Sequence, residues 1–207
     1  MQNLQDLYDF YIDTKPSPGK IKAASSLLIR LCKVLNLSSP EKITNDYYKE
    51  IPKMIDQYHG SSRNQAAQDK SVLAEMIGRY SPKDGWEATF DILLDDKDEN
   101  LRQFTLHTLE FSENENPEIS LNYIEKYKDN PETTMRHVAA HLTAALLTGK
   151  HFELMKKKLE LWCDNNHQHF AKDVLKGIRN CDDMKPKSPN RRSCEKAREW
   201  LTNRFNL

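Results

Sequence analysis

Few side chains in this sequence have the type and spacing needed for chemistry, and the first to consider are His137 and His141. Two histidines four positions apart share one face of a helix, which is a spacing that metal-binding pairs use. The zinc-protease pattern needs a glutamate directly after the first histidine, where this chain has Val138, and no third ligand is placed by the sequence. We therefore predict a structural or surface role for the pair, no bound metal and no cofactor.

Other catalytic signatures are absent from the sequence. It has no glycine-rich phosphate loop, no Gly-x-Ser-x-Gly turn and no cysteine–histidine pair with an evident orienting acid. The sequence favours a binding protein over an enzyme.

A basic stretch near the C-terminus is the strongest candidate for contact with nucleic acid. Arginine side chains there could donate paired hydrogen bonds to phosphate oxygens. The candidate residues, including two upstream positions, are Arg136, Lys172, Lys185, Lys187, Arg191, Arg192 and Arg198. The alternative is that this stretch is an ordinary solvated loop.

The formal net charge of zero hides an uneven distribution of charge. Residues 84–132 carry 4 basic and 14 acidic side chains, whereas residues 133–207 carry 15 basic and 8 acidic ones. Such a polarised chain could steer a charged partner. Asp95, Asp96 and Glu99 are the candidate contacts for a basic protein partner, and solvated helix faces are the alternative.

Apolar spacing predicts helices through nearly the whole chain. Residues 4–12 and 21–35 show apolar positions at intervals of three and four, and the six glycines and scarce β-branched segments argue against a sheet fold. Further helices are expected over 44–58, bent or restarted around Pro52, and over 72–80, 86–95, 99–111, 117–128, 132–148, 151–163, 167–181 and 190–204. The predicted class is all-α.

The sequence also indicates a compartment. No apolar run approaches the roughly 18 residues of a membrane span, and the first residues lack the basic and apolar regions of a signal peptide. The four cysteines lie far apart, which predicts unpaired thiols in a reducing environment. We expect a cytoplasmic protein without membrane contact.

A repeat of about 34 residues runs through the second half of the chain. The leading apolar positions Leu101, Met135 and Phe170 are separated by 34 and 35 residues, and each follows a helix that ends in a polar turn. Four and five residues later come further apolar or small residues, among them Leu106, Ala140 and Leu175. This period is typical of stacked helical hairpins, because a single hairpin cannot bury its own apolar stripe.

The turn acids followed by Leu101-Arg102 and Met135-Arg136 resemble those of HEAT-type repeats. Residues 130–178 are most similar to the HEAT-like repeats of the DNA alkylation repair family, in which a helix ending in Trp leads through a polar turn to a helix opening with Arg. In HEAT-type repeats the turn acid and the helix arginine bond to each other between repeats. The resemblance therefore implies structural roles for Arg102 and Arg136.

The same resemblance gives Trp86 and Asp91 an outside chance of a catalytic role. Glycosylases of the alkylation repair family hold a cationic base with Trp and stabilise the sugar cation with Asp. The two residues are five positions apart here instead of about one turn, and Arg102 lies in the very next helix, so the register departs from the family. A core Trp and a solvated Asp are the favoured interpretation.

These observations predict an α-solenoid of stacked HEAT-like helical hairpins with an N-terminal helical cap. The expected divisions are a cap region over 1–83, about three hairpins over 84–182, and a basic linker with a capping helix over 183–207. The expected function is a non-enzymatic scaffold for a macromolecular partner, with a protein favoured. The alternative is a DNA-binding or DNA-repair protein similar to the alkylation repair family.

Overall fold

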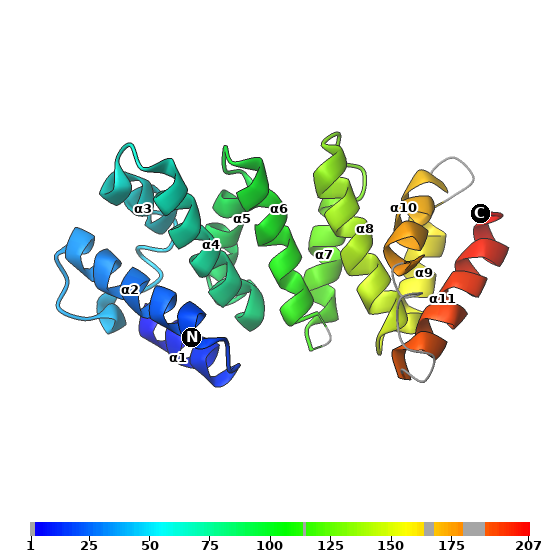
Figure 1. Cartoon of the computed structure of the whole chain (residues 1–207), viewed down its shortest axis with the longest axis horizontal. Coiled ribbons are helices and arrows are strands. Elements are labelled where there is room, and N and C mark those ends of the chain that lie inside the picture. The colour runs from blue at the N-terminus through cyan, green and yellow to red at the C-terminus, as the bar shows by residue number, and fades with distance from the viewer. Residues whose placement is uncertain (1–2, 114, 164–167, 180–188) are drawn as a thin grey trace. The chain divides into compact units, whose positions relative to one another are not determined.

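The computed structural model describes residues 3–113, 115–163, 168–179 and 189–207 (Figure 1). The described part is 77% helical with eleven α-helices and no strand, which confirms the all-α class. The helices are α1 (Leu4–Asp13), α2 (Pro18–Leu35), α3 (Ile51–His59), α4 (Arg63–Tyr80), α5 (Trp86–Leu94), α6 (Glu99–His107), α7 (Pro117–Tyr127), α8 (Thr133–Thr148), α9 (Phe152–Trp162), α10 (Gln168–Arg179) and α11 (Pro189–Phe205), with 3-10 turns η1 (Pro40–Lys42) and η2 (Thr108–Phe111). The packing of the helices is consistent with a helical array.

Local sequence explains where several helices begin. The side chain of Asn3 accepts a hydrogen bond from the Asp6 N–H (2.9 Å) and caps α1. Pro52 occupies the first turn of α3, where its missing N–H breaks no helical hydrogen bond. The helix expected over 44–58 begins too early, and of the two alternatives expected at Pro52 the structure has the start of a helix and not a bend.

The chain divides into two compact units, unit 1 over Met1–Ser112 and unit 2 over Glu113–Leu207. The boundary expected after residue 83 does not coincide with this division. It falls inside unit 1 because α4 packs against both α5 and α6.

In unit 1 the central helix is α4, which packs against α1, α2, α3, α5, α6 and η2. Three of its charged side chains are buried, with Asp69, Lys70 and Glu75 at most 7% exposed. Buried charges are tolerated when oppositely charged groups pair with them. The partners are Arg30 and His59 for Asp69, Asp56 and Asp96 for Lys70, and Lys20 and Arg79 for Glu75.

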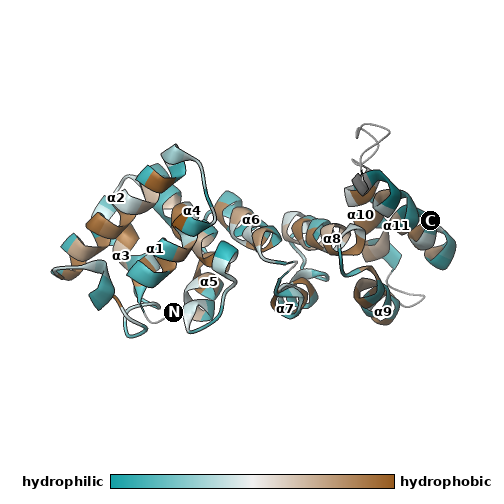
Figure 2. Ribbon diagram, turned by 90° about the horizontal axis from the view of Figure 1, so that it is seen from below, coloured by the Kyte–Doolittle hydropathy of each residue, from teal (hydrophilic) through white to brown (hydrophobic). Residues whose placement is uncertain are grey.

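In unit 2 the central helix is α8, which packs against α7, α9, α10 and α11. Figure 2 shows α7 and α9 on one side of α8 and α10. Small residues bring α8 and α10 close together, since a Cβ added to Gly177 would lie 3.2 Å from the Ala144 Cβ. Ala139 and Ala140 are also buried on α8.

The apolar positions predicted from the 34-residue period are buried. The exposed fractions of Leu101, Leu106, Met135, Ala140, Phe170 and Leu175 do not exceed 4%. The helical phase predicted for these three segments is therefore right.

Two turns that lie one repeat apart in the sequence have the same pattern of hydrogen bonds. In unit 1 the Asp96 carboxylate accepts a hydrogen bond from the Asp98 N–H (2.9 Å), and the Arg102 guanidinium donates one to the Asp96 carbonyl (2.7 Å). In unit 2 the Asn130 side chain accepts from the Glu132 N–H (2.9 Å), and Arg136 donates to the Asn130 carbonyl (3.2 Å). The sequence repeat thus corresponds to a repeated local structure in which arginine ties the turn to the helix that follows.

No helix in the described ranges combines the length and the apolar character needed to cross a membrane. Three cysteines lie in the described part, and Cys32, Cys163 and Cys194 are unbridged, while Cys181 lies outside it. The compartment stays a prediction.

Candidate functional site

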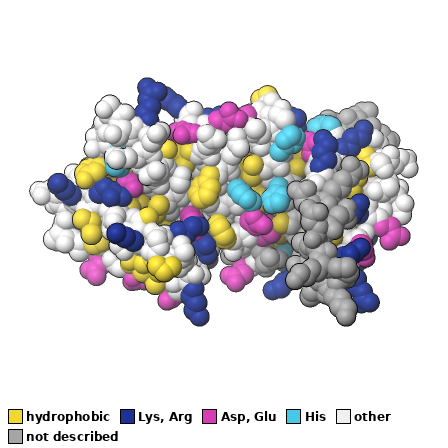
Figure 3. All heavy atoms as spheres, in the orientation of Figure 1, with side chains coloured by type: hydrophobic (Ala, Val, Ile, Leu, Met, Phe, Trp, Pro, Cys, Tyr) yellow, Lys and Arg dark blue, Asp and Glu magenta, His cyan; other side chains and the backbone are white. Residues whose placement is uncertain are grey.

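A groove runs along the exposed side of α4 in unit 1, between α2 and α6. Its volume is about 730 Å³. We call it the α4 groove, and its lining residues are Ala23, Asn64, Ala67, Gln68, Ser71, Val72, Asp98, Asn100, Leu101 and Phe104. In Figure 3, uncharged and apolar side chains cover most of the middle of the face that α2, α4 and α6 form.

The α4 groove combines exposed amides with apolar side chains. The exposed amides are those of Asn64, Gln68 and Asn100, and the partly exposed apolar side chains are those of Ala67, Val72 and Phe104. Among the described lining residues Asp98 is the one charged group, and its carboxylate accepts hydrogen bonds from the N–H groups of Asn100 (2.9 Å) and Leu101 (3.3 Å). The groove is therefore close to electrically neutral and can both donate and accept hydrogen bonds.

A second, polar hollow adjoins the groove at Gln68. It has a volume of about 490 Å³, and its lining residues are Arg30, Tyr58, His59, Gln65, Gln68 and Asp69. Inside it the Arg30 guanidinium donates two hydrogen bonds to the Asp69 carboxylate (2.8 and 2.5 Å), and the His59 Nε2 lies 2.8 Å from the same group. The charge of Arg30 is thus balanced by a buried carboxylate, so this hollow adds little net charge to the groove.

The acidic residues predicted to contact a protein differ in their surroundings. Asp95 and Glu99 are exposed. Asp96 is partly buried, and its Oδ2 lies 2.7 Å from the Nζ of Lys70. Burial by itself would lower the pKa of Lys70, but hydrogen bonds and charge from Asp56 and Asp96 raise it above its usual value. Asp96 therefore supports α4 from the turn before α6.

Trp86 and Asp91, the outside candidates for catalysis, do not form an open site. Trp86 is 0% exposed and stacks on Tyr48, with ring centroids 3.6 Å apart. Burial, together with the negative charges of Asp6 and Asp84, raises the pKa of Tyr48 to about 12. The indole of Trp86 thus belongs to the core of unit 1 and has no face on which a base could stack.

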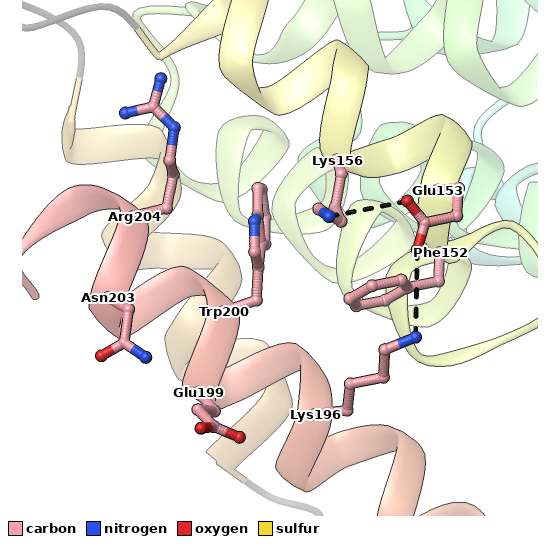
Figure 4. Close-up of a pocket in the computed structure, with 8 residues that line it drawn as sticks. All are labelled: Phe152, Glu153, Lys156, Lys196, Glu199, Trp200, Asn203 and Arg204. Atoms are coloured by element: carbon pink, nitrogen blue, oxygen red, sulfur yellow. Dashed lines mark ion pairs between the residues drawn. The ribbon is translucent and has the colours of Figure 1, made fainter.

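In unit 2 a hollow of about 430 Å³ lies between α9 and α11, and we call it the α9–α11 hollow (Figure 4). The residues that line it are Phe152, Glu153, Lys156, Lys196, Glu199, Trp200, Asn203 and Arg204. The rings of Phe152 and Trp200 meet edge to face at 6.3 Å, and the Lys196 Nζ lies 3.8 Å from the centre of the Phe152 ring. Aromatic and cationic groups therefore occupy one small site.

The predicted nucleic-acid contacts that the structure describes lie on α8, α10 and α11 and differ in their surroundings. Arg136 donates to the Asn130 carbonyl, and its Nε lies 3.5 Å from Asp173 of α10, so its guanidinium is engaged within unit 2. Lys172 and Arg192 are exposed, whereas Arg191 pairs with Glu195 (2.8 Å) and Arg198 is partly exposed. Lys185 and Lys187 lie outside the described residues.

His137 and His141 both belong to α8. The His137 Nε2 lies 3.8 Å from Asp173, which Lys176 also approaches at 2.9 Å. His137 therefore takes part in a surface charge cluster with α10.

Most residues that line the α4 groove were not among the predicted site residues. The segment 63–71 lacks a clear apolar stripe, so the start of α4 was placed too late and its open face was not recognised. A signal was present, because Asn64, Gln68 and Val72 recur every four residues and so share one helix face. Phe152, at the start of α9, is partly exposed.

No family model, curated protein or solved structure matches this chain.

Proposed function

We propose that this chain is a non-enzymatic protein-binding scaffold built from HEAT-like helical hairpins, and that the α4 groove binds an extended polypeptide segment. The neutral, amide-lined surface of this groove carries the proposal. The shared turn geometry at Asp96–Arg102 and Asn130–Arg136 supports the repeat architecture. A set of helical hairpins that present one helix of each pair to a ligand is a common way to build a binding surface.

The chemistry of the groove matches that of a peptide backbone. An extended peptide presents N–H donors and C=O acceptors that lack partners within its own strand. Each amide of Asn64, Gln68 and Asn100 supplies a donor and an acceptor in one side chain. The apolar surfaces of Val72 and Phe104 between these amides suit alternate side chains of such a segment.

A polyphosphate is a poorer fit to this groove. Nucleic-acid binding depends on cations that neutralise phosphates. No Lys or Arg lines the described groove, and the nearby Arg30 is engaged by Asp69. The charge of the groove thus favours a protein over DNA.

The proposal can be tested with a phage-displayed library of random peptides selected against the full chain. We expect enriched peptides whose binding is lost in Val72→Lys, because the substitution places an unpaired charge in the groove. Ile29→Lys is the matched control, since Ile29 is 70% exposed on α2 and does not line the groove. Peptides that bind wild type and Val72→Lys equally well would refute the assignment of the groove.

The alternative function, DNA binding similar to that of the alkylation repair family, has weaker support. Trp86 is buried against Tyr48, and Arg136 is engaged within unit 2. Titration of labelled duplex DNA at low and moderate salt separates the two functions. Binding with a steep salt dependence would favour the alternative, and no binding even at low salt would remove it.

A further inference from the structure

The α9–α11 hollow differs chemically from the α4 groove. The two helices α9 and α11 together carry eight basic and four acidic side chains. Three of the cations, Lys156, Lys196 and Arg204, line the hollow beside Phe152 and Trp200 (Figure 4). From this juxtaposition we propose that the α9–α11 hollow binds one nucleotide of a single-stranded nucleic acid, with its base on Trp200 and its phosphates on the three cations.

The indole of Trp200 is placed to receive a base. Its two contacts with described aromatic rings are edge-to-face, with Phe152 at 75° and with Phe205 at 84°. The Nζ of Lys156 lies over the Trp200 ring, 5.8 Å from its centroid, which places a cation beside the ring that receives the base. The Trp200 side chain is partly exposed. A flat aromatic face of this kind stacks a base of any sequence.

The cations around Trp200 are paired only loosely. Lys156 and Lys196 share the carboxylate of Glu153, at 3.6 and 4.0 Å, and this carboxylate is 73% exposed. Arg204 contacts Glu160 at 3.2 Å, with both side chains at least 41% exposed. Exposed pairs of this kind contribute little stability, so a phosphate can replace the carboxylates as the partner of these cations.

The shape of the hollow selects a single strand over a duplex. Its volume of about 430 Å³ is in the range of small-molecule sites. Trp200 lies between two helices, where a base that is still paired and stacked inside a duplex cannot enter. A base of a single strand can turn outward and reach the ring.

The test uses the full chain and an oligodeoxythymidylate, with tryptophan fluorescence as the readout. Trp86 and Trp162 are 0% and 8% exposed, so a change on binding reports Trp200. We expect quenching, and a logarithmic affinity that falls with the logarithm of the salt concentration with a slope of about −1.4, as the two phosphates that flank one nucleotide of a single strand give. A duplex of the same length should bind more weakly.

Variants then separate this site from general electrostatic attraction. Trp200→Leu should weaken binding by at least about fivefold, the lower end of the range for one stacked base, while Trp200→Phe retains part of the affinity. Lys196→Gln should reduce the salt slope by about 0.7. Lys157→Gln is the matched control, because it removes the same charge from an exposed position of α9 that does not line the hollow.

Several outcomes would overturn the proposal. These are the absence of binding at low salt, equal affinity for the duplex, an unchanged affinity in a folded Trp200→Leu variant, and an equal effect of Lys157→Gln and Lys196→Gln. Thermal unfolding of each variant shows whether it is folded. The substitutions all lie in unit 2, whereas the peptide selection tests the α4 groove of unit 1. Failure of one proposal can therefore be told apart from failure of the other.

Discussion

The helix α4 approaches η2 so closely in unit 1 that the contact admits only a glycine at residue 78. A Cβ added to Gly78 would lie 2.2 Å from the Thr108 Oγ1, 2.4 Å from its Cβ and 2.8 Å from its carbonyl oxygen. Thr108 is 1% exposed, and its hydroxyl donates to the Thr105 carbonyl at 2.6 Å. Rotation of the threonine would break this bond and leave the Cβ and backbone contacts in place, so η2 or α4 has to move.

The magnitude follows from two opposing effects of Gly78→Ala. Overpacking a buried contact costs about 1–3 kcal/mol, and the backbone contact places this site near the upper end. Replacing glycine by alanine inside a helix stabilises the folded state by about 1 kcal/mol, because alanine has the higher helix propensity. We therefore expect the free energy of unfolding of unit 1 to fall by about 2 kcal/mol. Thr108→Ala should not rescue the variant, because the Cβ of residue 108 remains.

Urea unfolding followed by the fluorescence of Trp86 measures the effect, in a background of Trp162→Phe and Trp200→Phe so that unit 1 alone is observed. Gly19→Ala is the control, since a Cβ there meets nothing within 4 Å and Gly19 lies in the first turn of α2. We expect Gly19→Ala to be neutral or to stabilise by up to about 1 kcal/mol. Equal stability of the Gly78 and Gly19 variants would refute the close packing of α4 on η2.

Three further predictions concern other parts of the chain. Asp96→Asn should lower the stability of unit 1 by about 1–3 kcal/mol, because it weakens the pairing of buried Lys70, whereas Asp95→Asn should leave urea unfolding unchanged. Burial raises the pKa of Tyr48 to about 12, so between about pH 10 and 12 its hydroxyl keeps its proton in the folded state and loses it in the unfolded state. The corresponding stability is complete below about pH 10 and falls as the pH rises through 12, which a late phase in tyrosinate absorbance and alkaline melting curves should show. Ala140→Leu should overpack α8 against its neighbours and cost about 1–3 kcal/mol, and an unchanged melting temperature would contradict this packing.

The sequence by itself determined the helical class and the phase of the repeated helices. Leu101, Met135 and Phe170 are buried as predicted, because a helix places residues three and four apart on one face whatever surrounds it. The resemblance to HEAT-type repeats implied that Arg102 and Arg136 bond to turn acids between repeats. The structure instead has each arginine donating to a backbone carbonyl of the turn six residues earlier in the chain.

Only the tertiary structure decided which polar residues are buried and where the surface is hollowed. Asp69 meets Arg30 across 39 positions, and Lys70 meets Asp96 across 26, so no local pattern reveals that these charges are neutralised. Trp200 and Phe152 meet in the same way, from helices separated in the chain by α10. A hollow is the space that several helices leave between them, and its position depends on packing among residues that the sequence keeps far apart.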